Sequence, residues 1–193
     1  MGRDKASLPF GSETLLGRVV RLVGEVAGPV VVVAAPEQQL PELPAKIIVA
    51  RDPVAGRGPL QGVAVGLAAL ASEVRYAFVS PTDAPLLAPA FVRRMGQLCD
   101  GYDVAVPQID GRTQVLAAVY RTALHELASE LLRDHQQRLV ALVEQVDAHA
   151  VDRQSLLADE GLRTADPQLD SLLNLNTWED YEAALARMGL GRH

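Results

Sequence analysis

Apolar residues recur along this chain with two periodicities, and each periodicity predicts a different kind of element. Between residues 13 and 27 they are spaced three and four positions apart, which predicts an amphipathic helix that ends at Gly28 and Pro29. The apolar positions of this helix are Leu15, Leu16, Val19, Val20, Val23 and Val26. Residues 30–35 follow as an unbroken apolar run, which is typical of a strand covered on both faces.

The same reading extends to the rest of the chain. It predicts further strands over residues 47–49, 76–79, 103–106 and 115–120, and an edge strand over 148–151. It predicts helices from the glycine-rich turn at 56–62 to about residue 71, and over 88–98, 122–133, 139–146 and 178–188.

Strands that alternate with helices predict an α/β protein with three layers, in which helices flank a mostly parallel central sheet. Ligands of such proteins bind at the carboxyl ends of the strands. Asp52 and Asp83 both come just after a predicted buried strand, each beside a proline. We also expect an opening strand before Lys5, and the sequence has none. Its absence would expose two sheet edges and a strip of core, at a cost of several kcal/mol.

Composition narrows the class of protein. The 193 residues are 49% apolar and 22% charged, as expected for one globular domain spanning residues 1–193. The net charge of −6 argues against nucleic-acid binding, and no apolar run is long enough to cross a membrane. No secretory signal is recognisable, so we expect a cytoplasmic protein. The single Cys99 excludes an internal disulfide and a multi-cysteine zinc site.

Asp83 is the strongest candidate for chemistry, in the proline-bracketed SPTDAP segment at residues 80–85. A carboxylate at the end of an apolar strand suits Mg²⁺, which takes one or two protein carboxylates and completes its shell with water and phosphate oxygens. The alternative is a structural role, in which Asp83 caps the helix that begins near Ala88 or orders the turn.

Three other segments carry candidate groups. GRGPLQG at residues 56–62 matches neither the dinucleotide fingerprint nor a Walker A loop, but its glycines would let a ligand approach the backbone; the alternative is a plain loop before a helix. Lys5 and Arg3, in MGRDKA at residues 1–6, form a small cationic group suited to phosphate or to solvent. NLNT at residues 174–177 precedes a helix that Asn176 or Thr177 would cap, which leaves Asn174 without a structural role.

The remaining reactive residue types carry no recognisable catalytic pattern. The four histidines lack paired ligand spacing, so we interpret them as structural or surface residues. Ser80 and Cys99 lack a nucleophile motif, so covalent catalysis is not expected.

The segments at residues 1–5, 58–62, 80–85 and 174–177, taken in this order, resemble the molybdenum cofactor guanylyltransferases, or MobA-like enzymes. The resemblance extends from residue 1 to about residue 187. It implies a Rossmann-like nucleotidyltransferase fold and Mg²⁺-dependent transfer of GMP from GTP to molybdopterin-bound molybdenum, with release of pyrophosphate. It also implies GTP and the molybdenum cofactor as substrates, and proteins that mature molybdenum enzymes as partners.

The resemblance further implies roles for individual residues. Lys5 would contact the phosphates, and Asp83 would bind the magnesium ion; these two would be the catalytic residues. Asp52 and Gly58 would lie at the nucleotide, Gln114 would face the acceptor, and Asn174 and Asn176 would lie near the metal and the acceptor. No enzyme base is required, because an oxygen of the acceptor phosphate is the attacking atom.

The sequence departs from the family pattern at its beginning, where the leading strand and the LAGGxSxR part of the loop are missing. We therefore hypothesise a longer native chain that carries the loop; an upstream-extended chain should be the more active one. A smaller departure is Trp178, which stands where the family pattern has proline. Two rival functions stay open: a cytidylyl- or other nucleotidyltransferase, and a non-catalytic homologue that binds a nucleotide or a partner protein.

Overall fold

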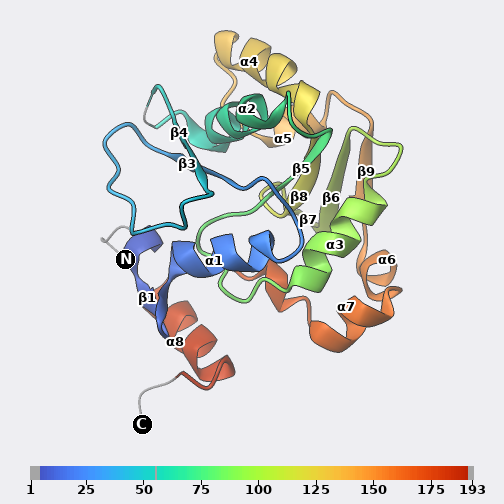
Figure 1. The fold of residues 1–193 in the computed structure, drawn as a ribbon. Coiled ribbons are helices and arrows are strands. Elements are labelled where there is room, and N and C mark those ends of the chain that lie inside the picture. The colour runs from blue at the N-terminus through green and yellow to red at the C-terminus, as the bar shows by residue number, and fades with distance from the viewer. Residues whose placement is uncertain (1–4, 55, 191–193) are drawn as a thin grey trace.

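The computed structural model describes residues 5–54 and 56–190, and its helices and strands alternate along most of the chain (Figure 1). The strands are β1 (Pro9–Phe10), β2 (Glu13–Thr14), β3 (Val31–Ala34), β4 (Ile48–Arg51), β5 (Tyr76–Val79), β6 (Val104–Ile109), β7 (Arg112–Thr113), β8 (Ala118–Arg121) and β9 (Ala148–Val151). The α-helices are α1 (Leu15–Gly24), α2 (Gly58–Leu70), α3 (Pro89–Leu98), α4 (His125–Arg133), α5 (Val140–Val143), α6 (Arg153–Leu157), α7 (Glu160–Ala165) and α8 (Trp178–Arg187). The 3₁₀ helices are η1 (Lys5–Ser7), η2 (Thr122–Leu124) and η3 (Asp170–Leu172).

The described strands form three sheets. The main sheet has five strands in the order β5-β8-β6-β7, with β9 paired to β6. Strands β3 and β4 form a separate parallel pair, and β1 and β2 form a short antiparallel pair. No described pairing joins β3 to β5, so the β3–β4 pair and the main sheet are separate sheets.

The α/β class is confirmed, while the directions of the strands are mixed rather than mostly parallel. Strand β8 runs antiparallel to both of its neighbours, β5 and β6, whereas β9 is parallel to β6. The short β7 also pairs antiparallel with β6, across a turn in which Asp110 and Gly111 have positive φ. The expected edge strand over residues 148–151 is β9.

The main sheet is covered by helices on both faces, as Figure 1 shows. Successive residues of β6 and β8 point to opposite faces of the sheet. Ala105 and Val119 pack with α3, α6 and α7, whereas Val104 and Tyr120 pack with α2, α4 and α5. The three-layer arrangement follows from this alternation, because both faces of the strands are apolar.

The helix predictions hold for α1, α2, α3, α4 and α8 within a few residues at each end. The helix expected over residues 139–146 is shorter, since α5 covers Val140–Val143. The sequence reading missed α6 and α7, which are capped by Asp152 and Asp159 through bonds of 2.7 Å to the backbone. Within residues 5–54 and 56–190, the helices lack the combined length and apolar character that a membrane span requires.

Truncating Phe91 should test the packing of the core on the α3 face. Phe91 is fully buried and contacts the edge of the Phe78 ring, with centroids 6.2 Å apart. Phe91→Ala should lower the free energy of unfolding by about 3–5 kcal/mol, because it removes buried surface and leaves a cavity. Denaturant unfolding would measure this loss. The control Leu173→Ala, at an exposed position, should change it by less than about 0.5 kcal/mol; equal effects would contradict the assignment of Phe91 to the core.

Candidate active site

An ion pair joins Lys5, at the start of η1, to Asp83, in the loop that follows β5. Lys5 Nζ lies 2.6 Å from Asp83 Oδ2. The side chain of Lys5 is 32% exposed and that of Asp83 is 14% exposed, whereas the surface pair of Arg133 and Glu130 is 74% and 61% exposed. Because a less exposed pair is less screened by water and salt, the charges of Lys5 and Asp83 are screened less than those of Arg133 and Glu130.

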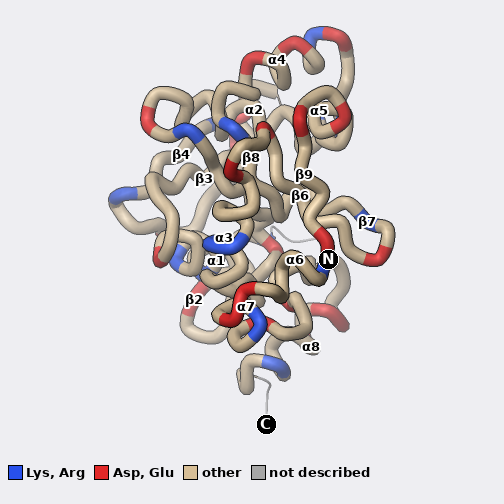
Figure 2. Tube along the Cα trace, turned by 90° about the vertical axis from the view of Figure 1, so that its right-hand side faces the viewer, with Lys and Arg blue, Asp and Glu red and all other residues tan. Residues whose placement is uncertain are grey.

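Charged residues elsewhere are mostly on the surface. Figure 2 shows Lys and Arg interspersed with Asp and Glu along the trace. On α1, for example, Arg21 pairs with Glu13 and with Glu25, each at 2.7 Å. Exposed pairs of this kind contribute about 0–1 kcal/mol each to stability. The pair of Lys5 and Asp83 differs from them in its location, at the carboxyl end of β5.

The backbone of the Asp83 loop is held from two distant parts of the chain. The Leu175 N–H donates a hydrogen bond of 2.9 Å to the carbonyl oxygen of Asp83. Arg18 Nε, on α1, donates a bond of 2.6 Å to the carbonyl oxygen of Pro85. Together with the bond from Lys5, these contacts set the position of the Asp83 carboxylate.

Arg18 is itself fixed on three sides. Its guanidinium lies 5.2 Å from the centre of the Phe10 ring and 3.6 Å from Glu13 Oε2, in addition to its bond to Pro85. Burial lowers the pKa of the guanidinium, and the charge of Arg21 lowers it further. Arginine remains charged at neutral pH, so Arg18 serves as a permanent donor to the loop.

The NLNT segment at residues 174–177 lies beside the pair of Lys5 and Asp83. Its middle residue, Leu175, is buried and anchors the segment. Leu175 packs with Leu8, Phe10 and Leu15, whereas Asn174 and Asn176 are exposed. The bond from the Leu175 N–H brings the segment against Asp83. Its two amide side chains are therefore accessible to a ligand near the ion pair.

A capping box orders the same segment. The Asp180 carboxylate accepts bonds from the N–H groups of Asn176 and Thr177, at 3.0 and 2.8 Å, and the Asp180 N–H donates to Thr177 Oγ1. The pKa of Asp180 lies below its ordinary value, mainly because the Thr177 N–H bonds to the carboxylate; the charge of Lys5 adds a smaller contribution. Of the two caps that the sequence left open, Thr177 is the observed one.

The structure thus brings four of the seven predicted site residues together: Lys5, Asp83, Asn174 and Asn176. The structure also excludes the alternative in which Asp83 caps the helix that begins near Ala88. The N-cap of α3 is Ala88 itself, which makes no side-chain capping bond. The predicted partner Arg3 lies outside the described residues.

Among the described residues, no hydrogen bond or ion pair joins Asp52, Gly58 or Gln114 to this group. Asp52 accepts a bond of 2.9 Å from the Val54 N–H, which closes a local turn. The expectation that Asp52 follows a buried strand is wrong, because Ile48 and Val49 of β4 are 40% and 44% exposed.

Gly58 and Gln114 have structural contacts of their own. Gly58 has φ +73°, and a Cβ placed there would lie 3.0 Å from the carbonyl oxygen of Gln137. The group that approaches Gly58 closely is therefore the backbone of Gln137, a part of the chain itself. Gln114 follows β7, and its N–H donates to the carbonyl oxygen of Pro107.

The described residues contain no cluster of three or more His, Cys, Asp or Glu side chains suited to a metal ion. Asp83 offers a single carboxylate, whose Oδ2 accepts the Lys5 bond. The structural reading of the histidines is confirmed for His149, which stacks on Tyr102 and bonds to the carbonyl oxygen of Leu98. Burial raises the pKa of Cys99 to about 11, so this thiol is not an activated nucleophile.

Arg18 escaped the sequence reading, and so did the capping-box bonds of Asp180, which the sequence reading placed only as an acidic residue in the first turn of the last helix. Arg18 gives no local signal, because its partner Pro85 is 67 residues away. Asp180 does have one: Thr177 followed by an acidic residue three positions later is the pattern of a capping box.

Comparison with known proteins places the chain in a family. The family model described as the MobA-like NTP transferase domain matches residues 1–151. A relative from Mycobacterium avium (strain 104), named a probable molybdenum cofactor guanylyltransferase, is 39% identical over 188 residues, which are 95% of this chain and 87% of the relative.

Two solved structures have a similar fold. Molybdopterin-guanine dinucleotide biosynthesis protein A from Archaeoglobus fulgidus has a TM-score of 0.76 at 20% identity, over 97% of this chain and 92% of that one. A Mycobacterium tuberculosis H37Rv protein in complex with manganese has a TM-score of 0.59 at 18% identity, over 96% and 93% of the two chains.

The fold and the related proteins define the class as a nucleotidyltransferase. Within this class, the chain belongs to the MobA-like NTP transferase family. Its Mycobacterium avium relative is named a probable molybdenum cofactor guanylyltransferase.

Removing the guanidinium of Arg18 should loosen the loop that carries Asp83. In Arg18→Met the carbonyl oxygen of Pro85 loses its donor, so the free energy of unfolding should fall by about 1–3 kcal/mol. Amide exchange over residues 83–87 should become faster by at least about tenfold. Hydrogen-exchange mass spectrometry would measure this change, with Arg93→Met, on an exposed part of α3, as the control. Unchanged exchange over 83–87 in Arg18→Met would show that Arg18 does not hold the loop.

The capping box should make the stability of the chain depend on pH. Because the folded state lowers the pKa of Asp180, the carboxylate stabilises the fold above the unfolded pKa of about 3.9, and this contribution is lost as the pH falls through the folded pKa. Asp180→Asn should therefore melt below the parent at pH 7, with a gap that closes at acidic pH. The control is Glu182→Gln, exposed on the same helix. A gap that stayed constant down to about pH 2 would contradict the charge-based role.

Proposed function

We propose that this protein transfers GMP from GTP to a molybdopterin-type molybdenum cofactor and releases pyrophosphate, with Mg²⁺ as cofactor. The observation that supports the proposal most is the ion pair of Lys5 and Asp83 at the carboxyl end of β5, beside the exposed Asn174 and Asn176. The name of the Mycobacterium avium relative supports guanine over other nucleotides.

Asp83 is the residue that would hold the metal ion. Magnesium binds through one or two carboxylates and keeps water and phosphate oxygens as its other ligands, so a single accessible carboxylate fits it. The manganese complex of the structural relative supports a divalent cation. When bound, such an ion neutralises charge on the phosphates.

Lys5 and the two asparagines would position the reactants. The Lys5 ammonium would donate to phosphate oxygens and stabilise the negative charge that develops during transfer. The Asn174 and Asn176 amides would hold the acceptor, which requires both donors and acceptors of hydrogen bonds. Asp83 also orients the Lys5 ammonium through its 2.6 Å bond.

The reaction needs no proton from the enzyme. An oxygen of the acceptor phosphate forms a bond to the α-phosphorus of GTP, and the bond from that phosphorus to the β-bridging oxygen breaks. The electron pair leaves with pyrophosphate. Positioning and charge neutralisation therefore carry the catalysis.

Other expectations from the sequence stay predictions. Asp52 and Gly58 remain candidates for nucleotide contacts, and Gln114 for the acceptor. The same holds for partner proteins in the maturation of molybdenum enzymes, for the cytoplasmic location and for a single domain over residues 1–193.

Asp83→Asn should test the proposal directly. It removes the charge that holds the metal and Lys5, so GMP transfer should fall by about 10²–10³-fold. Transfer would be measured as labelled GMP on the cofactor and as pyrophosphate released, with GTP or CTP as donor. Asp100→Asn, at an exposed aspartate after α3, is the matched control and should keep full activity.

Three outcomes would contradict parts of the proposal. Full activity in Asp83→Asn would exclude the metal role of Asp83. Transfer from CTP and not from GTP would favour the rival cytidylyltransferase. If the parent chain transferred neither nucleotide while GTP still raised its melting temperature, the non-catalytic homologue would be favoured.

A further inference from the structure

Trp178 is the only tryptophan of the chain, and it is 44% exposed to solvent. It is the first residue of α8 and directly follows the NLNT segment at residues 174–177. Tryptophan is usually well buried, because its large ring contributes much apolar surface to a core. Trp178 instead lies outside the buried cluster that contains Phe10 and Leu175. Packing of the core therefore does not account for this side chain.

Contacts between three aromatic rings fix the position of the indole. Trp178 meets Tyr181 edge to face, with ring centroids 5.6 Å apart and planes at 88°. Tyr181 in turn meets the ring of Phe10 at 6.2 Å, and its hydroxyl donates a hydrogen bond to the carbonyl oxygen of Pro9. Because Phe10 is fully buried, these contacts connect the exposed indole to the core.

The contact with Tyr181 leaves much of the indole accessible. In a perpendicular pair the edge of one ring meets the face of the other, so Tyr181 covers at most one face of the indole. Within the part of the chain that the structure describes, the indole N–H of Trp178 donates no hydrogen bond. One aromatic face and one donor are thus available to a ligand.

The indole lies on the side of α8 that faces the candidate active site. The Cα–Cβ bonds of a helix tilt toward its N-terminus, so the side chain of Trp178 leans back over the segment that carries the exposed Asn174 and Asn176. Its ring contacts turn it toward β1, which lies beside α8 in Figure 1. In addition, the charge of Lys5 helps to lower the pKa of Asp180, two residues after Trp178.

We propose that the indole of Trp178 is a stacking platform for the pterin ring of the acceptor, with the amides of Asn174 and Asn176 at the edge of that ring. This inference rests on the proposed function, which supplies the acceptor. The pyrimidine part of a pterin is flat and carries donors and acceptors at its rim. It can therefore stack on an aromatic face while amide side chains bond to its edge. Nucleobases, which are similar flat heterocycles, stack on aromatic side chains in the same way.

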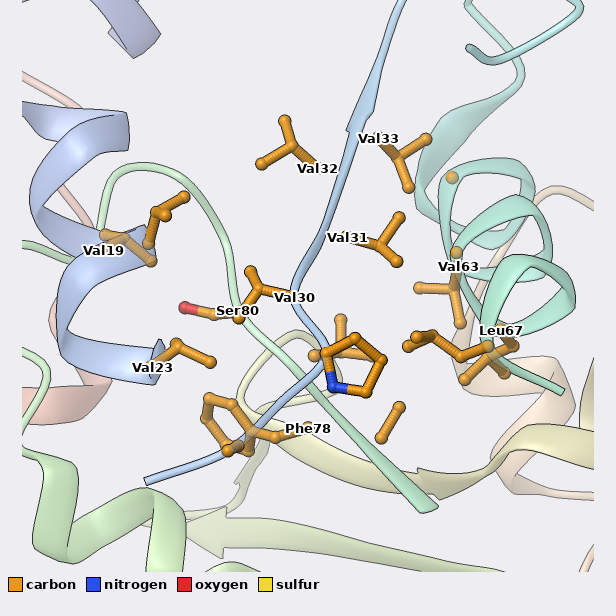
Figure 3. A pocket seen from close by; sticks show the side chains of 18 of the residues that line it. Val19, Val23, Val30, Val31, Val32, Val33, Val63, Leu67, Phe78 and Ser80 are labelled. Carbon is orange, nitrogen blue, oxygen red and sulfur yellow. The ribbon is translucent and has the colours of Figure 1, made fainter. Parts of the chain in front are cut away.

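The apolar cavity of about 350 Å³ between β3 and β5 suits this ring less well. Figure 3 shows Val19 and Val23 of α1, Leu67 of α2 and the valines of β3 around it. The residues that line it include no charged and no amide side chain. A pterin placed there would leave most of its donors and acceptors unpaired, which is costly in apolar surroundings.

Fluorescence would test the proposal directly, because all indole emission of the chain comes from Trp178. Metal-free molybdopterin, added under anaerobic conditions without GTP, should quench this emission and should protect the indole from quenching by acrylamide. The protection is the decisive part, since acrylamide must touch the indole, whereas energy transfer to a pterin acts over longer distances. GTP alone should not protect the indole. Protection by GTP alone would assign the platform to guanine and overturn the proposal.

Substitutions at the same position separate stacking from simple apolar contact. Trp178→Leu keeps an apolar side chain but removes the ring, so equilibrium dialysis should show molybdopterin bound about 5- to 150-fold more weakly. Trp178→Phe retains an aromatic face and should lose much less affinity. The matched control is Val49→Ala on β4, which is also 44% exposed and should bind normally. Melting curves would verify that each variant folds.

The transfer reaction gives an independent measurement. Trp178→Leu should raise KM for the acceptor and leave KM for GTP unchanged. The inference would be overturned if the parent chain did not bind molybdopterin, if bound molybdopterin left the indole unprotected, or if folded Trp178→Leu bound as tightly as the parent. A parent chain that bound molybdopterin on Trp178 but transferred no GMP would contradict the proposed function and support the stacking. Transfer of GMP with an unprotected indole would do the reverse.

Discussion

Among the residues that the structure describes, strand β5 pairs with another strand along one edge only, and much of the structure depends on its other edge and its carboxyl end. Through β8, the bonded edge connects β5 to the main sheet. The other edge borders the cavity that separates β5 from β3. The loop after Val79 carries Asp83, so any change in the position of β5 moves the candidate metal ligand.

The Asp83 loop is positioned by contacts from segments that are far apart in the chain. Lys5 binds its carboxylate, Leu175 binds its carbonyl oxygen, and Arg18 binds the carbonyl oxygen of Pro85. Each contact by itself is worth only about 1 kcal/mol or a little more. Their combined effect is geometric, because three fixed points leave the loop few alternative conformations. Such preorganisation is what a reaction based on charge neutralisation requires.

Much of the fold could be predicted because its elements depend on local patterns. Strand β5 begins and ends where the apolar run does, and Thr177 caps α8 as its sequence context indicates. The short helices α6 and α7 were missed because five or six residues are too few for a helical periodicity. The antiparallel direction of β8 was also missed, since strand direction depends on the path of the chain and not on the composition of the strand.

The sequence by itself determined the α/β class, most of the elements and the four segments that carry the family resemblance. Only the tertiary structure decided that Lys5, Asp83, Asn174 and Asn176 lie together, while Asp52 closes a local turn after an exposed strand. It also revealed Arg18 as the residue that holds the loop. The physical reason is one of range: periodicity and capping act over a few residues, whereas the 67 residues between Arg18 and Pro85 are brought together only by the packing of α1 against the rest of the fold.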